Sequence, residues 1–278
     1  MWVQAVGTWE MKGNWKRCAV ALAAFWMLGA ASASADGPQQ AELHIWAGNE
    51  ADDSGSFGLR SVEAAWWATE RDRFGVRYDN SLSLDNPTLA RAGVDAEGYF
   101  LSYMHDFDGR FLLTGEIGQR DLPGDAEQDI YKVEGVIFRE GDAIKLGAQV
   151  SPTEDPIDDY TDTVVWGAYN FAVGDEWRVE PALYVSQSGA AEDNEWRAAV
   201  YAEYNPPSEA WQVGVGAGYG DIDSDIPGAS GSVFNAHARM SFTVFEHHSV
   251  HFQVRYEDAP LTNYTTALVG VSFRLPRS

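Results

Sequence analysis

The sequence predicts an all-β fold, a membrane-spanning antiparallel up-and-down β-barrel with a best count of fourteen strands. Three observations predict it. Apolar and polar residues alternate along successive segments of roughly ten residues, short and longer connections alternate between these segments, and aromatic residues gather near segment ends. Strands can cross lipid without an unpaired edge only in a closed barrel. Twelve strands is the alternative count, because the faces of segment 59–70, which carries Glu63, are unclear.

The first 35 residues have the three parts of a cleaved signal peptide, namely a basic stretch, an apolar run and a small-residue cleavage site. The basic residues are Lys12, Lys16 and Arg17. The apolar run covers residues 18–29, which is too short to cross roughly 30 Å of hydrocarbon as a helix. Cleavage after Ala35 leaves residues 36–278 as a single barrel domain, and Met11 is an alternative start of the chain.

The composition excludes some classes of site and partner. The only cysteine, Cys18, lies in the predicted signal peptide, so disulfides, thiolate metal sites and cysteine nucleophiles are excluded from the rest of the chain. A net charge of −23 argues against a nucleic-acid partner. Asp221, Asp223 and Asp225 have the spacing that opens a calcium loop, but Ile226 stands where that loop needs glycine. We expect no metal site and no cofactor.

The alternation places the strands and their connections in the chain. The expected strands are 41–49, 59–70, 73–84, 97–106, 110–120, 128–139, 143–151, 161–172, 176–187, 195–204, 210–220, 232–244, 249–257 and 263–274. Short connections are expected near 71–72, 107–109, 141–142, 174–175, 206–208 and 246–248, and longer, acidic ones at 50–58, 85–96, 121–127, 152–160, 188–194, 221–231 and 258–262. Pro181 interrupts one strand, where we expect a bulge or weakened pairing.

One face of each expected strand is apolar, and its aromatic residues lie toward the strand ends. Those beside short connections are Phe74, Phe111, Trp177, Tyr204, Trp211 and Phe242, and those near long connections are Trp196, Tyr219, Phe234 and Tyr256. Two aromatic belts at the two lipid–water boundaries are typical of membrane barrels. A soluble β-sandwich is the alternative, but its apolar face is core and carries aromatic residues at any height.

The other face carries charges of both signs and some aromatic residues. The candidate lumen-lining residues are Arg77, Arg110, Glu116, Lys132, Glu134, Lys145, Arg178, Glu180, Tyr184, Arg197, Tyr201, Glu203, Arg239 and Arg255, and Trp46 is a further inward candidate. Such charges either pair across neighbouring strands and brace the barrel, or remain unpaired and line a water-filled pore. Inward aromatic rings beside charged groups also suit sugar rings.

The last expected strand resembles the C-terminal signal of bacterial outer-membrane proteins, because residues 265–273 alternate apolar and polar up to Phe273. Residues 274–278 then depart from the usual terminal aromatic. The whole of 36–278 is similar to the class of bacterial outer-membrane β-barrels. This resemblance implies a location in the outer membrane, short periplasmic turns, contacts with outer-membrane lipids and lipopolysaccharide, and insertion by the barrel-assembly machinery.

Three functions remain open. The first is a porin-like channel for small hydrophilic solutes such as saccharides. The second is an outer-membrane accessory of exopolysaccharide export, which implies partners from an export system. The third is a closed-lumen surface enzyme or structural barrel. We expect no enzyme, because no base lies within reach of a nucleophile: His237 and Ser241 are four residues apart along one strand, and His247, His248 and His251 cluster near a turn.

Overall fold

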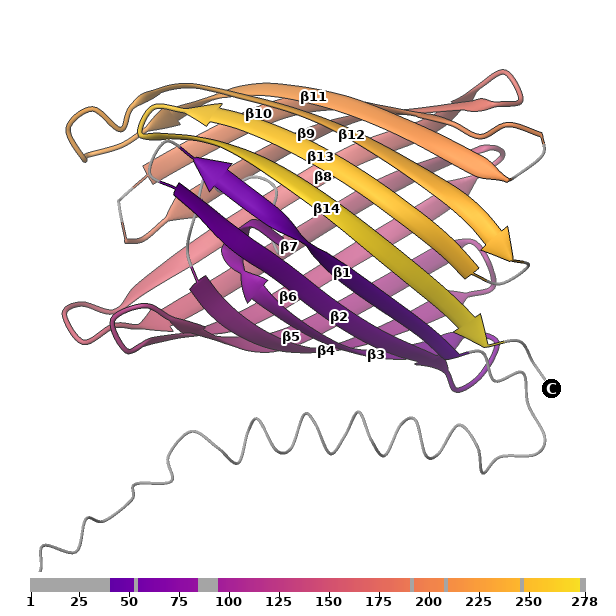
Figure 1. Ribbon diagram of the computed structural model, residues 1–278, viewed down its shortest axis with the longest axis horizontal. Helices are drawn as coiled ribbons and strands as arrows, with labels where there is room; N and C mark the ends of the chain where they lie inside the picture. The colour runs from indigo at the N-terminus through magenta and orange to yellow at the C-terminus, as the bar shows by residue number, and fades with distance from the viewer. Residues whose placement is uncertain are drawn as a thin grey trace, which may run out of the picture.

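In the computed structural model, fourteen antiparallel strands form a closed barrel (Figure 1). The structure describes residues 41–52, 55–84, 95–190, 193–207, 210–245 and 248–275, so the predicted signal peptide lies outside it. The strands are β1 (Ala41–Asp52), β2 (Gly55–Trp67), β3 (Asp72–Ser81), β4 (Asp95–Phe107), β5 (Phe111–Leu122), β6 (Ala126–Arg139), β7 (Asp142–Glu154), β8 (Tyr160–Val173), β9 (Trp177–Ser188), β10 (Asp193–Tyr204), β11 (Trp211–Asp223), β12 (Gly231–Phe245), β13 (His248–Ala259) and β14 (Thr262–Leu275). A 3-10 turn, η1 (Leu82–Leu84), follows β3. In these ranges no helix is long and apolar enough to cross a bilayer.

The barrel closes where the first and last strands meet. β1 pairs with β14 along its whole length, from Ala41 opposite Leu275 to Asp52 opposite Tyr264, and Figure 1 shows these indigo and yellow strands side by side. Every other strand pairs with its neighbours in sequence, so the topology is up and down. The prediction of fourteen strands is confirmed, and the alternative of twelve is wrong.

The connections are shorter than predicted at the end of the barrel opposite the termini. We call this the far end, and the end with Ala41 and Leu275 the terminal end. Three residues, 123–125, join β5 to β6, where Gly124 and Asp125 adopt φ values of 82° and 65°. Residues 53–54 separate β1 from β2, and residues 260–261 separate β13 from β14. The prediction of longer loops at 50–58, 121–127 and 258–262 is therefore wrong. The strands continue beyond the apolar segment, because ladder hydrogen bonds do not require apolar side chains.

Two prolines weaken the ladder without shifting it. Pro181 pairs with Val200 of β10, but the pairing of β8 with β9 lapses between Ala168 and Phe171 and resumes in the same register. The pairing of β6 with β7 lapses in the same way beside Pro152. Proline lacks the N–H that a ladder bond needs, so each proline affects only one of its two neighbouring strands. The weakened pairing predicted at Pro181 is confirmed, with no bulge.

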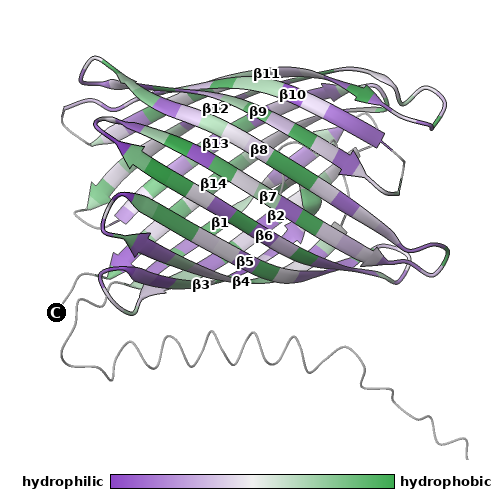
Figure 2. Ribbon diagram, turned by 180° about the vertical axis from the view of Figure 1, so that it is seen from behind, coloured by the Kyte–Doolittle hydropathy of each residue, from purple (hydrophilic) through white to green (hydrophobic). Residues whose placement is uncertain are grey.

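Burial is inverted relative to a soluble protein. Leu146 and Leu183 face outward and are 59% and 53% exposed, whereas the inward-facing Arg120 and Glu257 are fully buried. Hydrophobic and hydrophilic residues alternate along the strands in Figure 2. A sandwich or soluble barrel would bury the apolar face and expose the charges. The apolar face is therefore the one that contacts lipid, and the barrel spans the membrane.

Inward-facing aromatic rings lie over glycines of neighbouring strands. The directly opposed pairs are Trp46 with Gly270, Phe100 with Gly118, Trp166 with Gly147 and Tyr201 with Gly216. A Cβ atom at these glycines would lie 2.1–2.6 Å from the ring. Because glycine has no side chain, each ring can lie flat on the wall and does not project across the lumen.

We predict that Gly147→Ala destabilises the barrel by about 1–3 kcal/mol, the usual range for overpacking. The new methyl group would lie 2.1 Å from the Trp166 ring, whose indole N–H is held by Glu134 at 3.0 Å. The measurement is reversible urea unfolding in lipid vesicles. Gly115→Ala is the matched control, because nothing lies within 4 Å of a Cβ there. Equal effects of the two substitutions would contradict the role assigned to the glycine.

Candidate functional site in the barrel lumen

A charged cluster on β10, β13 and β14 fills part of the far half of the lumen. Arg197 pairs with Glu195 beside it and reaches Glu257 at 3.2 Å, although β11 and β12 lie between β10 and β13. Arg255 pairs with Glu257 at 2.6 Å and lies 5.6 Å from the centre of the Tyr264 ring. All five side chains are buried. We call them the Arg197 cluster.

The path from Arg197 to Glu257 crosses small residues. Ala199, Gly218 and Asn235 lie in register on β10, β11 and β12, and Asn235 is opposite Glu257. All four inward positions of β11 from 214 to 220 are glycines. A long side chain of β10 can therefore lie along the wall over β11.

A second cluster, with Asp79, Phe100 and Arg120 buried and Arg77 and Glu116 partly buried, lies on β3, β4 and β5. Arg77 contacts Asp79 at 2.5 Å and Glu116 at 3.0 Å, and Arg120 contacts Asp79 at 2.8 Å. The Phe100 ring lies under both guanidinium groups, 3.9 Å from Arg77 and 5.2 Å from Arg120. We call these five residues the Arg120 cluster.

Three uncharged side chains and one carboxylate lie between these clusters in the far half. Gln128 donates to Thr153 at 2.9 Å and to Asp162 at 3.3 Å, and Ser188 donates to Asp162 at 3.0 Å. These four side chains are also buried. Buried charges and amides need partners, and these have them. Much of the inner wall of the far half is therefore covered by polar side chains that are paired with one another.

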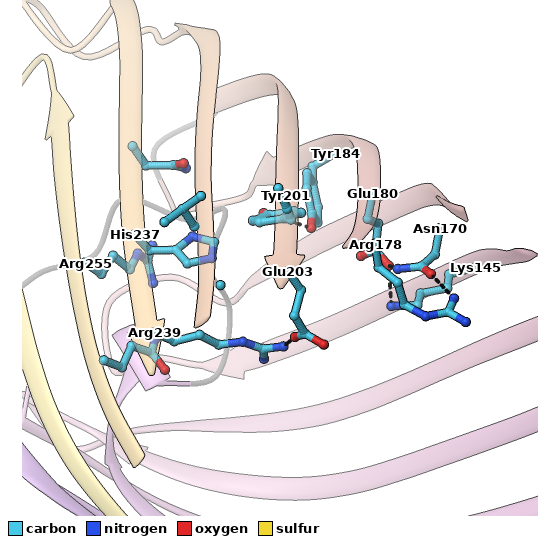
Figure 3. Close-up of a pocket in the computed structure, with 15 residues that line it drawn as sticks. Lys145, Asn170, Arg178, Glu180, Tyr184, Tyr201, Glu203, His237, Arg239 and Arg255 are labelled. Atoms are coloured by element: carbon cyan, nitrogen blue, oxygen red, sulfur yellow. Dashed lines mark hydrogen bonds and ion pairs between the residues drawn. The ribbon is translucent and has the colours of Figure 1, made fainter. Parts of the chain in front are cut away.

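Part of the terminal half of the lumen is hollow. A cavity of about 520 Å³ lies between β7 and β13 (Figure 3). Its lining residues are Lys145, Asn170, Arg178, Glu180, Tyr184, Tyr201, Ala202, Glu203, Gly214, Val215, Asn235, His237, Arg239, Gln253 and Arg255. We call it the lumen cavity. Its charged groups are four cations and two carboxylates, in a chain whose net charge is −23.

Hydrogen bonds organise the wall of the lumen cavity. Lys145 pairs with Glu180 at 2.6 Å, and Asn170 joins Glu180 to Arg178 through bonds of 3.1 and 2.8 Å. The hydroxyls of Tyr184 and Tyr201 lie 3.3 Å apart. Arg239 pairs with Glu203, and the Tyr201 and His237 rings lie 5.0 Å apart above the glycines of β11.

The predicted lumen-lining residues divide into four groups. Eight line the lumen cavity: Lys145, Arg178, Glu180, Tyr184, Tyr201, Glu203, Arg239 and Arg255. Arg77, Glu116 and Arg197 belong to the two buried clusters, together with Arg255, which also faces the cavity. Lys132 and Glu134 contact Trp166 on another part of the wall. Most of these charges therefore pair with neighbours, including charges that line the lumen cavity, and the lining of a water-filled pore by unpaired charges stays a prediction.

Arg110 is the exception. It lies exposed in the turn before β5, and the lumen assignment for it is a correction. Asp108 and Gly109 adopt positive φ values of 59° and 69°, and the Asp106 carboxylate accepts from the Gly109 N–H at 2.6 Å. The hairpin formed by these residues includes Arg110, so the strand begins one residue later at Phe111.

Sequence reasoning missed the residues that complete the buried clusters. Arg120, Glu195 and Glu257 stood at the ends of predicted strands, and Asp79 lay inside the strand predicted at 73–84 without being assigned to the lumen. Each lies two or four positions from a predicted lumen residue on the same strand. Continuing the period of two beyond the apolar segment would have found them.

The predicted belt residues all face outward. At the terminal end, Trp177, Tyr204 and Trp211 form a row with ring centres 5.1 and 5.4 Å apart. Phe74 lies between Trp66 and Tyr103 in a second row, with separations of 5.6 and 5.0 Å. The other members are Phe111 and Phe242 near the terminal end, and Trp196, Tyr219, Phe234 and Tyr256 toward the far end. Their contact with the membrane boundary stays a prediction.

A histidine and serine cluster lies at the terminal end of the lumen. The Ser272 hydroxyl lies 2.7 Å from His44 Nδ1 and 2.8 Å from His251 Nε2. His251 also contacts Ser241 at 2.8 Å and Ser249 at 3.0 Å. These contacts join β12, β13, β14 and β1, and the expectation that no base lies within reach of a nucleophile is wrong. Ser272 is only 6% exposed and is shared by two imidazoles, an arrangement that fits a brace between strands better than an accessible nucleophile.

Comparison with known proteins finds solved structures of similar fold but no relative that is similar in sequence. No protein-family model matches the chain, and no curated protein matches its sequence. A solved structure described as a bacterial polysaccharide outer membrane secretin aligns with a TM-score of 0.58 at 12% identity, over 87% of this chain and 100% of that one. A loop L8 deletion mutant of OmpT, an outer membrane protein of Vibrio cholerae, aligns with a TM-score of 0.54 at 11% identity, over 87% and 100%. An outer membrane channel from Pseudomonas putida F1 aligns with a TM-score of 0.51 at 9% identity, over 87% and 97%. The chain has the fold of the bacterial outer-membrane β-barrels.

We predict that Arg197→Met lowers the free energy of unfolding by about 3–5 kcal/mol, because it leaves the buried carboxylates of Glu195 and Glu257 short of a partner. The measurement is urea unfolding in vesicles. Arg71→Met is the control: Arg71 pairs with Asp108 in exposed turns, where an ion pair contributes about 0–1 kcal/mol. A loss below about 1 kcal/mol for Arg197→Met would show that the Arg197 cluster does not brace the wall.

Proposed function

We propose that the protein is a narrow outer-membrane channel for small hydrophilic solutes, saccharides among them. The observation that carries the proposal is the lumen itself, in which a polar and charged cavity in the terminal half adjoins a far half lined by packed ion pairs. A barrel of fourteen strands is intermediate in width between eight-stranded barrels, whose lumen is filled by side chains, and sixteen-stranded porins, whose lumen is open. The wall arrangement fits a channel of small conductance.

The orientation follows from the topology of the class. Both described chain ends lie at one end of the barrel (Figure 1), and outer-membrane barrels of this kind have short periplasmic turns. We therefore assign the terminal end, with the lumen cavity, to the periplasmic side. The far end then faces outward, with acidic connections such as 155–159. The barrel-assembly machinery and lipopolysaccharide are the partners that this location implies.

Export of a polysaccharide is the second candidate. Its specific support is the cavity at the assigned periplasmic side, where inward rings lie flat against the wall and cations outnumber carboxylates. A solved structure with a similar fold is described as a polysaccharide secretin, although at 12% identity the likeness extends to the fold alone. Deletion of the gene separates the two candidates: an export accessory predicts polymer trapped in the periplasm, and a passive channel predicts none.

We predict that the protein conducts ions in planar bilayers, in small steps, and that a bulky group in the lumen cavity blocks the current. In a Cys18→Ser background, Gln253→Cys provides a single thiol in the cavity lining. Modification with a bulky sulfonate reagent should remove most of the conductance. Asp158→Cys, in an exposed loop, should be modified with no effect on the current. A correctly folded barrel that never conducts would exclude the channel.

A further inference from the structure

The Arg178 guanidinium differs from the other cations of the lumen cavity, because its partners are uncharged. Arg178 Nη1 donates to the Asn170 side-chain oxygen at 2.8 Å and to the Gly141 carbonyl at 3.3 Å. Lys145, Arg239 and Arg255 each have a carboxylate partner. Among the described residues, no carboxylate pairs with Arg178. Its side chain is exposed, so its charge is accessible from the terminal end.

The cavity next to Arg178 has the size and the neutral groups of a sugar site. Its volume of about 520 Å³ lies inside the usual range for small-molecule pockets, roughly 300–1,000 Å³. Asn170, Asn235 and Gln253 line it with amides, and Tyr184 and Tyr201 add hydroxyls. These groups can donate to or accept from the hydroxyls of a saccharide.

A flat aromatic surface completes the cavity. The Tyr201 ring lies against Gly216, where a Cβ atom would be 2.4 Å from it, and beside His237. The glycine therefore keeps both rings low on the wall and leaves space above them. Pockets of this kind combine an aromatic surface with a few polar groups that orient the ligand.

We infer that the lumen cavity is a binding subsite for an acidic saccharide, whose carboxylate is bound by Arg178 and whose ring lies against Tyr201. A guanidinium fork matches a carboxylate in a bidentate geometry, and the fixed amides orient the hydroxyls. The inference deepens the proposed channel function and rests on it, since a subsite in the lumen selects among the solutes that pass.

Isothermal titration of the purified full chain in detergent tests the inference with four probes: glucuronate, glucose, acetate and glucose 6-phosphate. Glucuronate should bind at least tenfold more tightly than glucose, which lacks the charge, and acetate, which lacks the ring. Arg178→Ala should weaken glucuronate binding at least tenfold, the loss of a charge-assisted hydrogen bond. Arg178→Lys keeps the charge without the fork and should bind with intermediate affinity.

Arg139→Ala is the matched control, because Arg139 is exposed at the same end of the barrel and does not line the cavity. It should leave the affinity for glucuronate unchanged. Equal losses in Arg178→Ala and Arg139→Ala would show a general charge effect and overturn the subsite. Tighter binding of glucose 6-phosphate or acetate than of glucuronate would contradict the inference that the ligand is a saccharide with a carboxylate.

Bilayer recordings separate this inference from the proposed function. Glucuronate added at the terminal end should reduce the current of the wild-type protein, and the reduction should require at least tenfold more glucuronate in Arg178→Ala. A channel that conducts and neither binds glucuronate nor is blocked by it would overturn the subsite and leave the channel standing. Binding of glucuronate by a barrel that never conducts would support the subsite and exclude the channel.

Discussion

The structure depends on the pairing of every backbone N–H and C=O group that lies within the hydrocarbon, where water cannot substitute for a missing partner. Pairing of β1 with β14 along twelve residues meets this constraint, because it leaves no strand edge open. Closure then gives the sheet two faces in different environments, an outer face in lipid and an inner face toward the lumen. The outer face must be apolar, and the charged side chains of the strands can be accommodated only inside or at the ends, where they find partners or water.

The interior shows two ways of accommodating charge. In the far half, carboxylates such as Asp79 and Glu257 each contact two arginines, so ion pairs stand where a soluble protein has an apolar core. In the terminal half, ion pairs such as Lys145 with Glu180 lie along the wall, and the lumen cavity remains beside them. Glycines contribute to both halves: β11 lets Arg197 extend along the wall and lets Tyr201 and His237 lie flat upon it. The shape of the lumen is thus a result of which wall positions carry no side chain.

The strand number and the faces could be predicted from the sequence, because a period of two is a local property. Trp177, Val179, Leu183 and Val185 alternate with polar residues whichever strands lie beside them. The ends of the strands could not be placed in the same way, since the ladder continues into polar residues such as Glu127 and Glu154, which are paired. Contacts between strands that are distant in the sequence could not be predicted either. Arg197 meets Glu257 only because of the curvature of the wall and the small residues between them, which no local pattern reports.

The lapse beside Pro181, like the one beside Pro152, makes the barrel wall locally easier to open. β8 and β9 carry Asn170, Arg178 and Glu180, so one of the two strand pairs with missing ladder bonds also holds the exposed guanidinium of Arg178. Amide protons near Tyr169 should exchange with solvent deuterium sooner than those of the fully paired β1 and β14, because local opening needs fewer bonds to break. The barrel therefore combines a fully paired junction between its first and last strands with a wall that is more weakly paired beside the lumen cavity.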